Sequence, residues 1–139
     1  MAGPDLPTVY LVDDQALVRA SFRSWLEGSN EYAVIGQQGD PRAAIVEIGS
    51  LKPDLVLLDI SMPGMTGLEA LPLIIDANPR GIVAMVTDFE SVTLVQQALD
   101  GGARGYLSKA AEPDEMLEAL ARILAGERFV SPRIEGWPP

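Results

Sequence analysis

Four segments that lie far apart in the sequence each end a short apolar run on a polar side chain. The runs end on Asp13-Asp14, on Asp59, on Thr87 and on Lys109. If the four runs are parallel strands of one sheet, these side chains lie together at its carboxyl edge, where open α/β sheets bind ligands. Three carboxylates, one hydroxyl and one ammonium on a single edge suit a divalent cation and a phosphoryl group.

The three carboxylates of this set indicate a cation site lined by oxygen. Carboxylates this close repel one another unless a cation neutralises them or one of them is protonated. The chain has no cysteine and no histidine, so a metal must be held by oxygen ligands, which favours Mg²⁺, Ca²⁺ or Mn²⁺. Asp59 is the candidate nucleophile, because carboxylates can form acyl phosphates. Thr87 and Lys109 would then contact the phosphoryl oxygens.

Each of these residues has a simpler explanation when it is taken alone. A single Asp after a strand more often caps the next helix, and a single Thr more often closes a turn. A single Lys is more often a solvated surface residue. The simpler explanation would need a separate coincidence at each of four strand ends, and we therefore interpret the set as one site.

The pattern between these residues predicts an α/β fold. Short apolar runs near residues 9–12, 32–35, 55–58, 82–86 and 103–108 alternate with segments of helical period. Five such βα units predict a doubly wound, five-stranded parallel sheet in the order 2-1-3-4-5, with helices on both faces. In that order the first and third strands flank the switch point of the sheet, where Asp13, Asp14 and Asp59 converge.

Composition limits the classes of protein to consider. The 139 residues fit one domain, which we place at residues 7–126, with residues 127–139 as a tail or the stub of a linker. The formal charge of −10 argues against nucleic-acid binding by this segment alone. No signal peptide or membrane-spanning run is evident, so a cytoplasmic protein is expected.

These motifs resemble the receiver domains of two-component response regulators, which have a flavodoxin-like fold. The resemblance rests on residues 12–14, 57–67 and 105–109 and on Thr87. The spacings also agree, with 45 residues from Asp14 to Asp59 and 22 from Thr87 to Lys109. Residues 97–109 and 113–117 are similar to the LuxR/NarL-type (FixJ-like) subgroup, in which a helix-turn-helix DNA-binding domain follows the receiver. We expect that domain in a longer protein.

This resemblance implies a role for each acidic residue of the set. Asp59 accepts a phosphoryl group from a sensor histidine kinase. Mg²⁺ is held by Asp14, Asp59 and the main-chain carbonyl of Ser61, and Asp13 acts through a metal-bound water. The chain would catalyse its own phosphorylation and dephosphorylation without being an enzyme that turns over a substrate.

The resemblance also implies how the phosphoryl group is sensed. Lys109 pairs with Asp59 and its phosphoryl group, Thr87 swings to bond a phosphoryl oxygen, and Tyr106 follows into the vacated space. This changes the surface formed by the helix over 91–100, the strand over 103–108 and the last helix, and so controls an output, transcription in this subgroup. A homodimer would form through that surface or through a face of the first and last helices.

Two positions qualify this assignment, and two other functions remain open. Asp88 stands where the family usually has a small or apolar residue, and Ser61 stands where water approaches an acyl phosphate, so both are expected to modulate the reaction. A Mg²⁺-dependent aspartyl-phosphate hydrolase is one alternative, although such enzymes usually place the nucleophile after their first strand. A receiver-like module that binds partners without phosphorylation is the other, and Asp88 is its only support.

Overall fold

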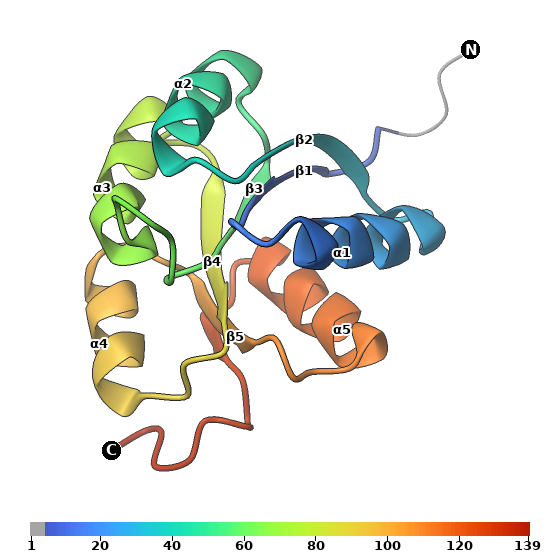
Figure 1. The fold of residues 1–139 in the computed structure, drawn as a ribbon. Coiled ribbons are helices and arrows are strands. Elements are labelled where there is room, and N and C mark those ends of the chain that lie inside the picture. The colour runs from blue at the N-terminus through green and yellow to red at the C-terminus, as the bar shows by residue number, and fades with distance from the viewer. Residues whose placement is uncertain (1–4) are drawn as a thin grey trace.

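Strands and helices alternate along residues 5–139, the part of the chain that the computed structural model describes. The predicted five βα units are all present (Figure 1). The strands are β1 (Thr8–Val12), β2 (Ala33–Gln38), β3 (Leu55–Leu58), β4 (Ile82–Thr87), β5 (Gly105–Ser108) and β6 (Phe129–Val130). The helices are α1 (Ala16–Gly28), α2 (Pro41–Leu51), α3 (Gly67–Ala77), α4 (Val92–Asp100) and α5 (Pro113–Leu124).

The strands form one parallel sheet in the order β2-β1-β3-β4-β5-β6. The predicted order of the first five strands is confirmed, but the predicted number of strands is wrong, because within residues 5–139 the sheet has six. The sixth, β6, lies beside β5: the Phe129 amide donates to the Arg104 carbonyl (3.0 Å), and the Ser131 amide donates to the Tyr106 carbonyl (2.9 Å). A two-residue strand has no apolar run or alternation from which to predict it.

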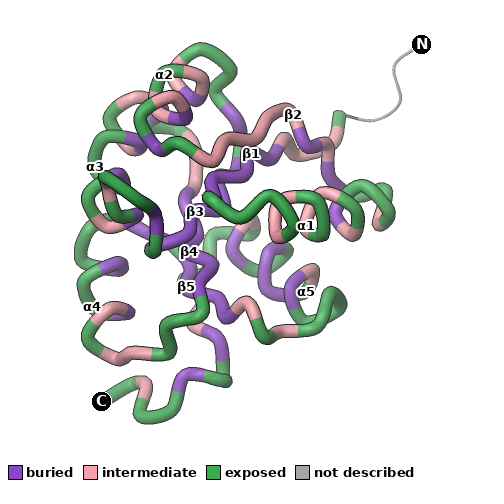
Figure 2. Tube along the Cα trace, viewed as in Figure 1, coloured by how far each residue is buried: buried purple, intermediate pink, exposed green. Residues whose placement is uncertain are grey.

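Helices cover both faces of the sheet, and each face has its own core. Figure 1 shows α2, α3 and α4 on one side and α1 and α5 on the other. Tyr10 and Val56 belong to the core beneath the first group, whereas Leu11 and Leu57 belong to the core beneath the second. Because successive strand residues point to opposite, covered faces, the central strands are buried almost throughout (Figure 2).

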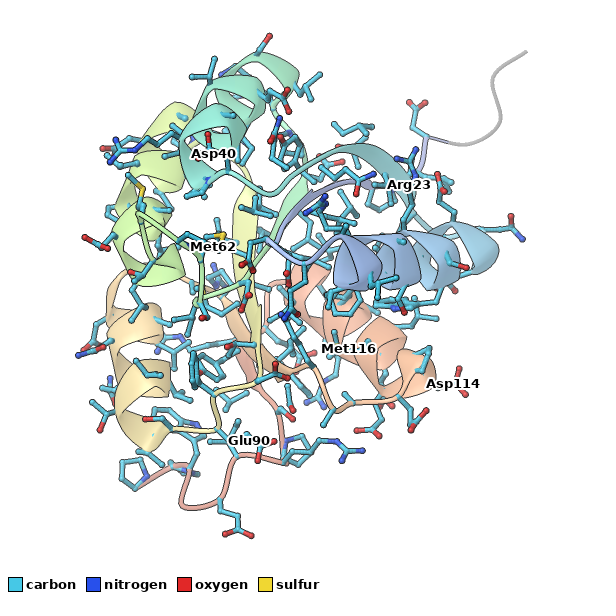
Figure 3. All side chains as sticks on the ribbon, viewed as in Figure 1. Arg23, Asp40, Met62, Glu90, Asp114 and Met116 are labelled. Carbon is cyan, nitrogen blue, oxygen red and sulfur yellow. The ribbon has the colours of Figure 1, made fainter. Side chains whose placement is uncertain are left out.

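Local signals set where the helices begin. Asp40, labelled in Figure 3, caps α2, and Pro41 occupies its first position, as predicted. Thr66 and Glu69 form a capping box at the start of α3. Pro72 lies inside α3, and the helix continues through it to Ala77. Within the described residues, no helix has the length and apolar character needed to cross a membrane.

The segment predicted to be a tail or linker stub packs onto the domain. After β6, the Ile134 side chain is 3% exposed and lies in the core on the α2–α4 side, where the partly buried Trp137 also packs. The Arg133 guanidinium donates to both carboxylate oxygens of Glu115 on α5, at 3.1 and 2.6 Å. Residues 129–137 therefore belong to the folded unit and lie along the β5 edge of the sheet.

Candidate functional site

The backbone of the site is held by the sheet itself. Three amides just beyond a strand end each donate to a carbonyl on the neighbouring strand: Asp13 to Gln38 (3.1 Å), Asp59 to Val12 (3.0 Å) and Lys109 to Thr87 (3.0 Å). The parallel register aligns Val12 with Leu58 and Thr87 with Ser108. Leu58 also pairs with Met85, so β4 runs two residues past the end of β3. The carboxyl ends of β1, β3, β4 and β5 nevertheless lie at one edge, and the predicted convergence of Asp13, Asp59, Thr87 and Lys109 is observed.

Lys109 joins the two buried carboxylates of this edge. Its Nζ lies 2.7 Å from Oδ2 of Asp13 and 3.1 Å from Oδ2 of Asp59. The side chains of Asp13 and Asp59 are 9% and 4% exposed, so neither carboxylate is well solvated. Two carboxylates in such a place need a cation to offset their repulsion and the cost of burying them. The ammonium of Lys109 fills this role.

Burial and charge also set the protonation of these groups. Burial, and secondarily the charge of Asp13, raises the pKa of the Asp59 carboxyl above its ordinary value, while Lys109 opposes the rise. Burial lowers the pKa of the Lys109 ammonium, but its hydrogen bonds to Asp13 and Asp59 outweigh this, so the net pKa lies above the ordinary value. Lys109 is therefore charged at neutral pH and favours the ionised form of Asp59.

The acidic side chains have the composition and spacing of a cation site. One carboxylate oxygen from each of Asp13, Asp14 and Asp59 lies within 4.8 Å of the other two. Asp13 and Asp59 are buried, while Asp14 is exposed and faces a pocket of about 210 Å³ that Ser61 also lines. All available ligands are oxygens, and a pocket open to solvent leaves room for water and phosphate oxygens. This donor set fits Mg²⁺.

Thr87 and Tyr106 are connected through the backbone of Phe89. The Thr87 hydroxyl is buried and accepts a hydrogen bond from the Phe89 amide (3.2 Å). The Tyr106 hydroxyl donates to the Phe89 carbonyl (2.5 Å), and its side chain is fully buried. Burial, followed by the charges of Asp59 and Glu90, raises the pKa of Tyr106 to about 12. A movement of Thr87 thus reaches Tyr106 through a single residue.

The family model described as the response regulator receiver domain matches residues 9–121. The chain belongs to this family. Among its relatives, response regulator GacA of Pseudomonas viridiflava is 36% identical over 126 residues, which are 91% of this chain and 59% of that protein. The nitrate/nitrite response regulator protein NarL of Escherichia coli K12 is 34% identical over 131 residues, or 94% of this chain and 61% of that protein.

Solved receiver structures share the fold described above. A two-component response regulator of the LuxR family from Aurantimonas superposes with a TM-score of 0.88 at 32% identity, over 94% of this chain and 93% of that one. The present chain is thus a receiver domain of the two-component response regulators, with relatives of the LuxR/NarL type. It spans about three fifths of the length of the curated relatives named above.

The two residues that are expected to modulate the reaction line the same pocket. Asp88 and Ser61 are exposed and line the pocket together with Asp14, Asp59 and Lys109. Asp88 therefore adds a further negative charge to this pocket. Its position beside the site agrees with the expectation from the sequence, while its effect on the reaction is still a prediction.

One residue that contacts the site was not predicted from the sequence. Arg19 on α1 donates from Nη1 to the main-chain carbonyl of Asp13 at 2.5 Å. In the sequence it is one polar residue among several in an amphipathic helix, and helical periodicity separates apolar from polar faces only. It does not separate a polar residue that faces a site from one that faces solvent.

Proposed function

We propose that this receiver accepts a phosphoryl group on Asp59 from a phosphohistidine of a sensor histidine kinase, in a reaction that depends on Mg²⁺. One observation carries the proposal: Lys109 bridges the buried carboxylates of Asp13 and Asp59 beside the exposed Asp14, at one open pocket. This arrangement combines a nucleophile, a cation site and a cation for the phosphoryl oxygens. It is the composition that phosphoryl transfer to a carboxylate requires.

In the proposed reaction, a carboxylate oxygen of Asp59 forms a bond to phosphorus as the P–N bond of the phosphohistidine breaks. The imidazole nitrogen keeps the bonding electrons and takes up a proton. Asp14, Asp59 and the main-chain carbonyl of Ser61 would hold Mg²⁺, with Asp13 acting through a water. The bound ion would neutralise charge on the phosphoryl oxygens. Lys109, already 3.1 Å from Asp59, would turn its hydrogen bonds towards these oxygens.

The connection from Thr87 to Tyr106 supports a switch in the same region. When the Thr87 hydroxyl bonds a phosphoryl oxygen, it gives up its hydrogen bond from the Phe89 amide. The Phe89 carbonyl, which accepts from Tyr106, then shifts with its loop. The change reaches the surface formed by α4, β5 and α5, and this surface would then favour a homodimer or another partner. A face formed by α1 and α5 is the second candidate for a homodimer.

The proposed output, control of transcription, is inferred from relatives that are longer than this chain. Their LuxR- and NarL-type character supports control of transcription through a DNA-binding domain in a longer, cytoplasmic protein. The receiver itself would be a phosphoacceptor that catalyses its own phosphorylation and dephosphorylation, not an enzyme acting on a separate substrate. Its net charge of −10 supports a role in which DNA binding lies outside this segment.

Incubation with acetyl phosphate and MgCl₂, followed by intact-mass measurement, tests the proposal. Wild-type protein should gain the mass of one phosphoryl group, and EDTA should prevent the gain. Asp59→Asn should abolish it, whereas Asp76→Asn, an exposed carboxylate on α3, should leave it unchanged. A mass gain that persists in Asp59→Asn would contradict the assignment of Asp59.

A further inference from the structure

The guanidinium of Arg19 connects three parts of the chain near the metal-binding edge. Nη1 donates to the main-chain carbonyl of Asp13 at 2.5 Å, and Nε donates to the side-chain oxygen of Gln37 at 3.2 Å. Gly39 lies so close that a Cβ there would be 3.0 Å from Nη1. Arg19, in the first turn of α1, is therefore tied both to the end of β1 and to the end of β2.

The carbonyl that Arg19 holds belongs to the peptide group between Asp13 and Asp14. Because this group is planar, fixing its oxygen also fixes the amide nitrogen and Cα of Asp14. The rest of Asp13 is held as well: Oδ1 accepts from the Gln15 amide (2.8 Å), and Oδ2 accepts from Lys109 (2.7 Å). Asp14, in contrast, is exposed. Its carboxylate therefore takes its direction from the backbone more than from packing.

We propose that Arg19 is a positioning residue for Mg²⁺: through the Asp13 carbonyl it orients the Asp14 carboxylate towards Asp59. The inference rests on the proposed function, because it concerns the same metal site. Groups that orient metal ligands from outside the coordination shell commonly change metal affinity by about 10- to 100-fold when they are removed. Arg19 acts through a backbone carbonyl and not on a ligand atom, so the lower end of that range is expected.

A purely electrostatic role for Arg19 predicts the opposite change in Mg²⁺ affinity when Arg19 is lost. Arg19, Asp13 and Asp59 line one narrow void of about 10 Å³, so the guanidinium lies near both carboxylates. If Arg19 acted only through its charge, its loss would leave the site more negative and would strengthen Mg²⁺ binding. Arg19→Lys keeps the charge and removes the planar fork that reaches Asp13 and Gln37 together. This variant isolates positioning from charge.

Calorimetric titration of the metal-free chain with MgCl₂ tests the inference. The dissociation constant should rise about tenfold in Arg19→Lys and by less in Arg19→Met, because the loss of a positive charge in Arg19→Met offsets part of the lost positioning. Gln37→Ala, which removes the second anchor of the guanidinium, should raise it about threefold. Arg23→Lys is the matched control, because Arg23 lies one turn farther along α1, is labelled in Figure 3 and pairs with Glu27. Its dissociation constant should equal that of the wild type.

Thermal unfolding in EDTA separates positioning from a general effect on folding. A merely structural role would lower the melting temperature of Arg19→Lys and leave its Mg²⁺ dissociation constant unchanged, and that result would overturn the inference. Tighter Mg²⁺ binding by Arg19→Lys would also overturn it. If the wild-type protein bound no Mg²⁺, this inference and the metal dependence of the proposed function would both fall. If the wild type bound Mg²⁺ and Arg19→Lys bound it with the same dissociation constant, only the proposed role of Arg19 would be overturned.

Discussion

The ammonium nitrogen of Lys109 lies 2.7 Å from Oδ2 of Asp13, and each of the two side chains is less than one tenth exposed. The same nitrogen lies 3.1 Å from Asp59, the candidate phosphoacceptor. One buried cation is therefore shared between two carboxylates of the candidate metal site, one of which is the candidate nucleophile. Loss of that cation leaves two buried carboxylates close together without a positive charge beside them, which is among the more costly changes in a folded protein.

Lys109→Met should therefore destabilise the metal-free protein by about 3 kcal/mol, a typical cost of breaking a buried ion pair. Urea unfolding in EDTA measures the change. The double variant Asp59→Asn/Lys109→Met is the control: it carries one buried charge fewer and should be more stable than Lys109→Met alone. Equal stability of Lys109→Met and wild type in EDTA would mean that the ion pairs contribute little to folding.

Tyr106 should titrate at a pH of about 12, because burial and the charges of Asp59 and Glu90 raise its pKa. A raised pKa means that the folded state binds the phenolic proton more tightly than the unfolded chain, whose tyrosine pKa is about 10. The resulting stabilisation is complete below pH 10 and is lost as the pH rises through 12. Tyrosinate absorbance of the wild type and of Tyr106→Phe measures this step.

In that titration, Tyr106→Phe should lack the step near pH 12, and Tyr32→Phe should retain it. The Tyr106→Phe substitution also leaves the main-chain carbonyl of Phe89 without its hydrogen-bond donor. A loss of about 1 kcal/mol in the free energy of unfolding is therefore expected at neutral pH. A Tyr106 transition near the ordinary pKa would show that the hydroxyl is more exposed than its contacts indicate.

The residues at the strand ends were predictable because one physical rule places them. Asp59 and Lys109 directly follow buried strands, Thr87 ends one, and parallel strands of similar length end at the same edge of the sheet. The ladder extends one residue past β1, β3 and β5, so even the residues just outside the strands are held. Sequence periodicity, together with the strand order that doubly wound sheets have, therefore predicted the order of the first five strands and the residues that meet at this edge.

Other contacts depend on geometry that local sequence does not encode. Arg19 reaches the Asp13 carbonyl only because of how α1 is oriented after β1, which tertiary packing decides. The link from Tyr106 to Phe89 runs through a main-chain carbonyl, and side-chain identity carries no signal for such an acceptor. The pairing of β6 with β5 involves two residues, too few for a period of two to be recognised.

Ile134 provides a test of the packed C-terminal segment. Its side chain is 3% exposed in the core on the α2–α4 side, so Ile134→Ala should lower the free energy of unfolding by about 3 kcal/mol. Glu135→Ala changes the exposed neighbour and should have almost no effect. Urea unfolding of both variants is the measurement. If Ile134→Ala were as stable as the wild type, residues 127–139 would behave as the tail that the sequence predicted.

Asp88 provides a test of the entrance to the phosphorylation pocket. Its exposed carboxylate lines the pocket through which an anionic phosphodonor must approach, so Asp88→Ala should speed phosphorylation by acetyl phosphate. A like charge within several ångströms in a solvated pocket opposes an anion by about 0.6 kcal/mol, or roughly threefold in rate. Asp100→Ala removes the same charge at the last residue of α4 and should leave the rate unchanged.

The salt dependence of the rate distinguishes charge repulsion from a steric effect of Asp88. Raising ionic strength screens exposed charges, so the advantage of Asp88→Ala over wild type should shrink as NaCl is added. Asp88→Asn keeps the size of the side chain and should show the same gain as Asp88→Ala if charge is the cause. An equal gain at low and high salt, or none in Asp88→Asn, would indicate that the bulk of Asp88 and not its charge limits access to Asp59.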